Sequence, residues 1–262
     1  MNKLRGKENA MNMKRMHAIP VALLGLTLTL GLLSSAQAQD TPKDWPSPMH
    51  DDTVLSKFML ERFERRDAKP ADLTYWEAQA WIGGDINKLW FKTEGSRTQG
   101  TTEDANLELY YSRAVAAFWD VQVGVRHDLS AGSTPARDWL GVGFQGLAPY
   151  LFEVDATAYL GGNGRSALRL KAGYDLLLSQ RLVLMPELEL SAYGKADPER
   201  SLGSGLSDAS MTLSLRYEIR REFAPYVGVM WTQKYGGTAD YARSAGDAAS
   251  ETQYLVGIRA WW

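Results

Sequence analysis

Apolar and polar residues alternate with a period of two through most of the chain. In the segment 150–160 every even-numbered position is apolar, whereas the odd-numbered positions include Glu153 and Asp155. Such alternation over about ten residues predicts a β-strand with one apolar face. The same pattern recurs in four further segments, which are 168–176, 182–190, 211–219 and 252–262.

The length of these runs separates two architectures. Strands in soluble sandwiches average about five or six residues, whereas a strand that crosses a membrane needs about nine to eleven. The runs are close to the longer value, which favours an all-β, transmembrane antiparallel up-and-down β-barrel of the outer-membrane type. We predict about twelve strands, at 56–65, 73–82, 88–97, 105–115, 120–129, 138–146, 150–160, 167–177, 181–193, 209–219, 225–235 and 252–262.

The predicted connections alternate in length. Outer-membrane barrels have an even number of strands, short periplasmic turns and longer external loops, so we expect both termini on the periplasmic side. The first strand is ambiguous, because Lys57–Phe63 also fits a short helix, which would leave an odd number of strands. Tight turns are predicted at 83–87, 116–119, 147–149, 178–180 and 220–224, and the longer loops include 194–208 and 236–251.

The N-terminal segment has the pattern of a secretory signal peptide. Lys14 and Arg15 precede an apolar stretch at 18–33, and a small-residue cleavage site follows at 35–38. The apolar run is short for a transmembrane helix, although an uncleaved membrane anchor is the alternative. The resulting organisation is a cleaved signal peptide (1–38), a short proline-containing periplasmic tail (39–55) and an outer-membrane barrel (56–262).

Composition narrows the function. There is no cysteine, which excludes disulfides, thiolate metal sites and thiol catalysis. Removal of 1–38 takes away five basic side chains and one acidic one, which changes the net charge from −2 to −6. An acidic exported chain is a poor binder of nucleic acid and a better binder of cations.

Aromatic residues make up 11% of the chain, and a barrel explains them. Interfacial girdles of Trp and Tyr lie where lipid meets water, and we predict this place for Trp76, Trp90, Trp119, Trp231 and Trp262. The C-terminal Trp261–Trp262 pair resembles the signal that the barrel-assembly machinery reads. That machinery and outer-membrane lipid are therefore expected partners.

Charged and sulfur-containing side chains occupy the opposite, inward faces of the strands. Carboxylates two residues apart on one strand point the same way and can share a cation. Carboxylate and thioether ligands together suit copper better than calcium. The alternative is salt-bridged packing of the lumen, with methionine filling gaps. The inward candidates for copper are Glu77, Glu94, Glu153, Asp155, Met185, Glu187, Glu189 and Met230.

The tail offers a second candidate copper site. Met49, His50 and Asp51 provide a thioether, an imidazole and a carboxylate within three residues, although a plain linker is the alternative. Thioether ligands suit Cu(I), whereas imidazole and carboxylate suit Cu(II), so both oxidation states stay open. His127 has outward parity near the outer rim, and we interpret it as an interfacial residue.

Motifs for catalysis are missing from the sequence. A hydrolase of the Ser/His/Asp type needs a histidine base held by partners. His127 has Asp128 and Ser130 beside it on one strand end, and such neighbours do not form a relay. Nucleophile-elbow, nucleotide-binding and zinc-protease motifs do not occur. We therefore predict that the protein is not an enzyme.

Several long strings carry a family resemblance. They are Trp76–Trp90 followed by Thr93–Gly95, Gly146–Tyr150 with Phe152–Ala156, Tyr193–Lys195 through Gly203–Asp208, and Arg216–Tyr226. These strings resemble the copper-resistance protein B family, and the likeness spans about Pro48–Trp262. The resemblance implies an outer-membrane barrel in the copper tolerance of Gram-negative bacteria, which works beside a periplasmic multicopper oxidase.

One departure from that family concerns the tail. Members of the family often carry a Met- and His-rich tail that gathers copper, whereas 39–52 holds one Met and one His. Two hypotheses follow. In the first, the protein binds copper or exports it from the periplasm across the outer membrane. In the second, it is a general structural or diffusion barrel without metal selectivity.

Overall fold

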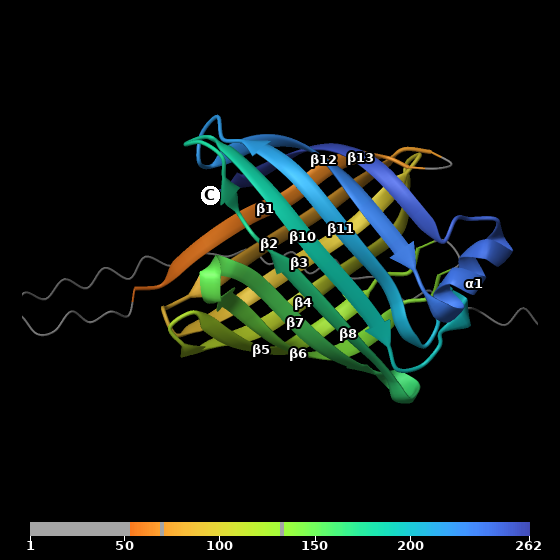
Figure 1. Cartoon of the computed structure of the whole chain (residues 1–262). Helices are drawn as coiled ribbons and strands as arrows, with labels where there is room; N and C mark the ends of the chain where they lie inside the picture. Colours follow the sequence, from red (N-terminus) through yellow and green to blue (C-terminus); the bar gives the residue numbers. More distant parts are fainter. Residues whose placement is uncertain (1–52, 69–70, 132–133) are drawn as a thin grey trace, which may run out of the picture. The chain divides into compact units, whose positions relative to one another are not determined.

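A computed structural model describes residues 53–68, 71–131 and 134–262. Within them, twelve long antiparallel strands close into a barrel, shown in Figure 1. The long strands are β1 (Leu55–Asp67), β2 (Leu73–Gly83), β3 (Asn87–Thr98), β4 (Thr101–Ala116), β5 (Trp119–Asp128), β6 (Arg137–Ala148), β7 (Phe152–Gly161), β8 (Arg165–Gly173), β10 (Leu182–Tyr193), β11 (Gly205–Tyr217), β12 (Phe223–Lys234) and β13 (Ser250–Trp261). The short elements are the 3₁₀ turns η1 (Pro149–Leu151), η2 (Gly162–Gly164) and η3 (Pro198–Arg200), the two-residue strand β9 (Leu176–Leu177) and the helix α1 (Gly236–Ala245).

Closure of the sheet depends on the first and last strands. β1 pairs with β13, and Met59 lies opposite Trp261. Phe58 and Trp262 add two backbone hydrogen bonds of 3.0 and 2.9 Å beyond that register. β10 pairs with both β8 and β11, so the ring is complete. A closed ring satisfies backbone groups that lipid cannot. The predicted barrel and its first strand are confirmed, and the helical alternative for Lys57–Phe63 is wrong.

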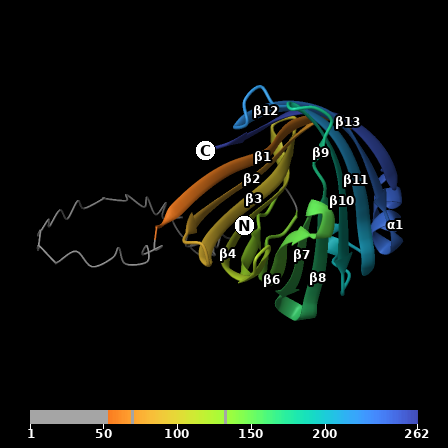
Figure 2. The same cartoon turned by 60° about the vertical axis from the view of Figure 1, so that its left-hand side comes forward.

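The barrel has two distinct ends. We call the end that holds Leu55, Trp261 and the β2–β3, β4–β5, β6–β7, β8–β10 and β11–β12 connections the turn end, and the opposite one the loop end. Figure 2 shows the ring from a second direction. The helix α1 and the 3₁₀ turn η3 lie in connections of the loop end. Among the described residues, no helix is long and apolar enough to cross a membrane.

The connections differ from the prediction in four places. At the loop end, β3 and β4 are joined by Gln99 and Gly100 alone, and η2 joins β7 to β8, so two outer connections are short. The predicted strand 167–177 ends at Gly173, and β9 follows within a longer turn-end connection. The predicted loop 236–251 contains α1.

The missed helix α1 begins with two glycines, which have low helix propensity. Contacts with the neighbouring connection hold it instead. The Thr238 hydroxyl accepts a 2.9 Å hydrogen bond from the Gly203 backbone N–H and lies 2.9 Å from the Ser207 hydroxyl. Gly246 then ends the helix in the left-handed conformation, with φ of 87°. These contacts are tertiary, so the local sequence does not reveal them.

The two faces of the sheet reverse the usual distribution in a soluble protein. Large apolar side chains on the outer face are exposed, as Leu140 and Leu160 show at 64% and 63%. Polar side chains on the inner face are buried, and Ser112 and Gln122 are 0% and 1% exposed. An apolar exterior around a polar interior is the pattern of a barrel that spans an outer membrane.

Part of the inner face is aromatic. Met59, Trp90 and Tyr110 form a buried cluster, and Gly141 leaves room for it, since a Cβ there would lie 2.6 Å from the Tyr110 hydroxyl oxygen. Trp90 is only 8% exposed, so its predicted place in an interfacial girdle is wrong. It shares the inward parity of Lys92, and parity decides its side of the sheet.

Candidate functional site

A cavity of about 490 Å³ lies inside the barrel. Its lining begins at the turn end with Lys57, Leu147 and Tyr174, and continues to mid-barrel positions such as Asn106 and Arg169. Because inward side chains come from every second residue of each strand, strands far apart in the sequence meet across this space. Most of the predicted inward copper ligands therefore lie around this one cavity.

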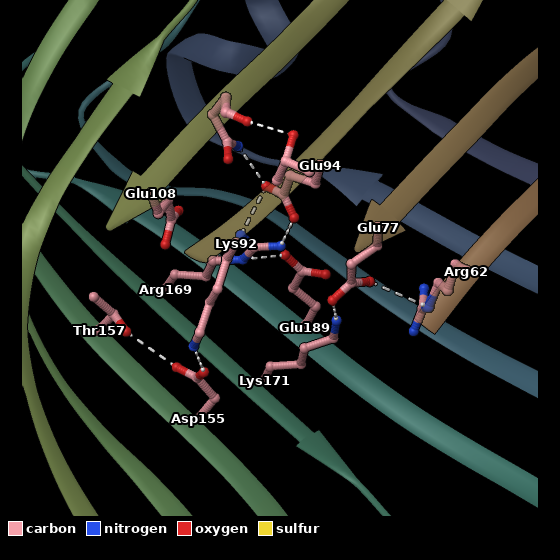
Figure 3. A network of polar contacts seen from close by, with 12 residues as sticks. Arg62, Glu77, Lys92, Glu94, Glu108, Asp155, Thr157, Arg169, Lys171 and Glu189 are labelled. Atoms are coloured by element: carbon pink, nitrogen blue, oxygen red, sulfur yellow. Dashed lines mark hydrogen bonds and ion pairs between the residues drawn. The ribbon is translucent and has the colours of Figure 1, made fainter. Parts of the chain in front are cut away.

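One group of ion pairs joins β1, β2, β8 and β10 across the lumen. The Lys171 ammonium lies 2.6 Å from Glu77 Oε1 and 3.9 Å from Glu187 Oε1. The Arg62 guanidinium contacts the same two carboxylates, through a 3.4 Å pair with Glu77 and a hydrogen bond to Glu187. Two acids and two bases therefore balance each other. Figure 3 shows Arg62, Glu77 and Lys171 of this group beside the next group.

A second group centres on Arg169 of β8. Its Nη2 lies 2.6 Å from Glu94 Oε2, and its Nε lies 2.6 Å from Glu189 Oε1 (Figure 3). Asn106 donates a further 2.9 Å hydrogen bond to Glu94. One guanidinium thus holds two carboxylates from opposite sides of the barrel.

A third group centres on Lys92 of β3. Its ammonium lies 3.1 Å from Asp155 Oδ2 and donates to the side-chain oxygens of Gln122 and Gln145, at 3.2 Å each. Glu77, Glu94, Asp155, Glu187 and Glu189 thus all contact a lysine or arginine. Among the described residues, no group of three or more His, Asp or Glu side chains could hold a metal ion. A cation that used these five carboxylates would have to displace resident ammonium or guanidinium groups.

Glu153 differs from the other predicted carboxylates. It lines the cavity at the start of β7, and in the described part of the chain no lysine or arginine nitrogen lies within 4.0 Å of it. Met185 lines the same region, and its sulfur accepts a 3.0 Å contact from Arg216. Met230 has the predicted inward parity on β12, but it does not line this cavity.

Two acids in this region are not among the predicted copper ligands. Glu61 pairs with Arg259 at 2.8 Å, and Asp175 pairs with Arg216 at 2.8 Å. A register shift in β1 between Leu60 and Arg62 places both Glu61 and Arg62 in the lumen, and Asp175 lies beyond the end of β8. The vestibule is defined here as the turn-end part of the cavity that Glu61, Glu153, Asp175 and Met185 line. The other predicted ligands, Met49, His50 and Asp51, lie outside the described residues.

Arginines also organise the loop end. Asp197, which is only 5% exposed, lies 2.9 Å from Arg137 Nε and 3.1 Å from Arg165 Nε. Arg200 extends the cluster to Asp104 at 3.0 Å. These pairs attach the β10–β11 connection to β6 and β8. The hydrogen bond from Arg137 and the nearby guanidinium charges lower the pKa of Asp197 below its usual range.

This cluster predicts an acid-sensitive loop. A carboxylate with a lowered pKa in the folded state stabilises that state above the pKa it has when unfolded, and the contribution is lost as pH falls through the lowered value. We expect the hydrogen-exchange protection factors of residues 194–204, which are corrected for the pH dependence of intrinsic exchange, to be high at neutral pH and to fall only below about pH 4. In Asp197→Asn the protection factors should be low at every pH. High, pH-independent protection in both proteins would contradict this role of Asp197.

His127 has the outward orientation that its parity predicts. Its Nδ1 lies 2.6 Å from Asp138 Oδ1, and its side chain is 46% exposed. Leu140 and Leu160 border the same outer surface. The histidine therefore does not contribute to the cavity.

Comparison with known proteins agrees with this architecture. Residues 54–262 match the family described as Copper resistance protein B precursor (CopB). Over 214 residues the chain is 44% identical to a copper resistance protein B homolog of Pseudomonas syringae pv. tomato and 42% identical to copper resistance protein B of Escherichia coli. Each alignment covers 82% of this chain and 72% of the relative.

A solved structure of the NanC porin resembles the barrel, with a TM-score of 0.54 and 15% sequence identity. The match covers 78% of this chain and 98% of the porin. That likeness supports the outer-membrane barrel fold alone. The family match is decisive for identity, because it spans the whole described barrel. The chain belongs to the copper resistance protein B family, and its role lies in copper resistance at the outer membrane.

Proposed function

We propose that the barrel binds copper in the vestibule and exports it through the lumen from the periplasm. The observation that carries the proposal is that Glu153 and Met185, a carboxylate and a thioether, both line the turn end of the cavity, and that no lysine or arginine nitrogen of the described residues lies within 4.0 Å of Glu153. Carboxylate and thioether are ligands of Cu(II) and Cu(I), respectively. Short turns of outer-membrane barrels face the periplasm, so copper would enter at this end.

Passage beyond the vestibule requires exchange of ion pairs. Glu77 and Glu187 contact Lys171 and Arg62. A copper ion would bind the two carboxylates in place of the Lys171 and Arg62 side chains, which would move aside. The resident positive charges would repel ions that bind carboxylates weakly. Copper, near the top of the affinity order of divalent metals, would compete best. This exchange would make the path selective without a permanent metal site.

The tail and a partner complete the proposal. Met49, His50 and Asp51 precede β1 in the sequence and would bind copper transiently before it reaches the vestibule. A periplasmic multicopper oxidase is the proposed source, and it would dock on the turn end. The chain itself is assigned no catalytic step.

The second candidate function is a general structural or diffusion barrel. The observation in its favour is that five of the predicted carboxylates are bound by lysine or arginine. In that case the charges would only fill the lumen, and no metal would be preferred.

Metal flux from liposomes separates the two functions. Liposomes that contain the refolded barrel would be loaded with copper, zinc or calcium, and copper would be tested with and without a reductant. We expect copper to leave at least tenfold faster than zinc and calcium. Barrel-free liposomes control for leakage. Equal or negligible flux of all three metals would contradict export and favour a structural or docking role.

A further inference from the structure

Most arginines of the barrel are engaged by acids, but among the exceptions in the described residues are three that lie on two turns at the turn end. Arg62, Arg126, Arg169 and Arg216, for example, all lie within 4.0 Å of carboxylates. In the part of the chain that the structure describes, no carboxylate lies that close to the guanidinium groups of Arg181, Arg220 and Arg221, which are exposed.

The three residues belong to neighbouring turns. The Glu218 backbone N–H donates a 2.7 Å hydrogen bond to the Arg181 carbonyl, which joins the β8–β10 and β11–β12 connections. The Trp261 side chain donates a 2.8 Å hydrogen bond to the Arg221 carbonyl, so the C-terminal strand supports the second turn. Figures 1 and 2 show both turns at the end of the barrel where the C-terminus lies. The backbone that carries the arginines is therefore fixed.

The nearby acids leave these turns with excess positive charge. Asp175 and Glu218 both bind Arg216, at 2.8 and 3.2 Å, and so are already engaged. With Arg216 included, four arginines face three acids, because Glu222 is the remaining acid of the two turns. The patch thus has one positive charge in excess and attracts an anion.

Exposed apolar side chains accompany the arginines. Leu177, Leu178 and Ile219 are 71%, 55% and 52% exposed on the same two turns. Tyr217 and Val227 continue an apolar outer surface along β11 and β12, at 47% and 56% exposed. The arginines therefore lie where the apolar band of the barrel ends, which is the level of lipid headgroups.

We propose that this surface is a binding site for anionic phospholipid of the leaflet at the turn end. We call it the arginine rim, and it comprises Arg181, Arg220, Arg221, Leu177, Leu178 and Ile219. Guanidinium groups bind phosphate oxygens through paired hydrogen bonds, and the leucines and isoleucine contact the acyl chains. An acidic soluble protein would account for the charge but would leave the apolar side chains without a partner.

Lipid binding to the refolded barrel tests the proposal. Native mass spectrometry in detergent would compare phosphatidylglycerol with phosphatidylcholine of the same chain length. We expect the wild type to prefer phosphatidylglycerol at least tenfold and Arg181→Gln/Arg220→Gln/Arg221→Gln to lose this preference. Inorganic phosphate should compete poorly, because it lacks acyl chains. Equal binding of both lipids by the wild type would overturn the site.

Two further variants keep the result interpretable. Arg65→Gln/Arg97→Gln/Arg243→Gln removes the same charge from exposed arginines at the loop end and should keep the preference. Arg181→Lys/Arg220→Lys/Arg221→Lys keeps the charge and serves if the glutamine variant does not fold, and we expect a preference reduced severalfold. The proposal would be contradicted if the lysine variant kept the full lipid preference, or if the loop-end control lost as much preference as the glutamine variant. Stronger binding of polyglutamate than of phosphatidylglycerol would contradict it as well.

Discussion

Replacement of Arg169 by methionine is expected to lower the free energy of unfolding by about 3–5 kcal/mol. The guanidinium holds Glu94 and Glu189 together at 2.6 Å each. These carboxylates have side chains only 19% and 20% exposed, so water replaces the lost contacts poorly. Two adjacent negative charges would then also repel each other. Urea unfolding of the barrel in lipid vesicles measures the effect.

A triple variant separates the effect of carboxylate repulsion from the effect of the lost arginine side chain. Arg169→Met/Glu94→Gln/Glu189→Gln removes the repulsion along with the guanidinium, and we expect it to recover most of the lost stability. Arg65→Met is the matched surface control. Its ion pair with Asp72 involves side chains 67% and 45% exposed, so its loss should amount to no more than about 1 kcal/mol. Equal losses for Arg169→Met and Arg65→Met would show that the lumen network is fully hydrated.

The second large effect is expected at the vestibule and depends on the proposed function. Glu153→Gln/Met185→Leu should weaken copper binding by the refolded barrel at least tenfold and lower the copper tolerance of cells that express it. Glu153 has no lysine or arginine within 4.0 Å among the described residues, so its neutralisation leaves no orphaned cation. Arg216, which contacts the Met185 sulfur, keeps Asp175 and Glu218 as partners, so stability in urea should change little. Copper titration and growth in copper provide the two measurements.

Glu153 and Met185 are better test positions than Glu187 and Glu189, because their replacement should not disturb folding. Glu187→Gln/Glu189→Gln would remove acids that hold Arg62, Lys171 and Arg169, so lower copper tolerance could reflect poor folding. Glu103→Gln, an exposed acid near the start of β4 at the loop end, is the matched control and should leave copper tolerance unchanged. Normal copper binding by Glu153→Gln/Met185→Leu at wild-type barrel levels would remove the vestibule from the proposed path.

The alternation of apolar and polar residues was sufficient to predict the barrel. A strand that separates lipid from a polar interior must place every second side chain on the apolar side, so segments such as 150–160 reveal both their length and their orientation. The same parity correctly placed Glu77, Asp155 and Glu187 inside and His127 outside. Alternation does not hold throughout β1, because the register shift between Leu60 and Arg62 places both Glu61 and Arg62 in the lumen.

Sequence by itself determined which side of the sheet most residues occupy, because that depends on neighbours within one strand. It also determined the family, through strings such as Trp76–Trp90. Only the tertiary structure decided which inward charges meet. Lys171 and Glu77 lie 94 positions apart yet 2.6 Å from each other, whereas Glu153 has no lysine or arginine nitrogen within 4.0 Å among the residues that the structure describes. Curvature, strand tilt and closure of the ring bring these side chains together, and none of them is encoded in a local pattern.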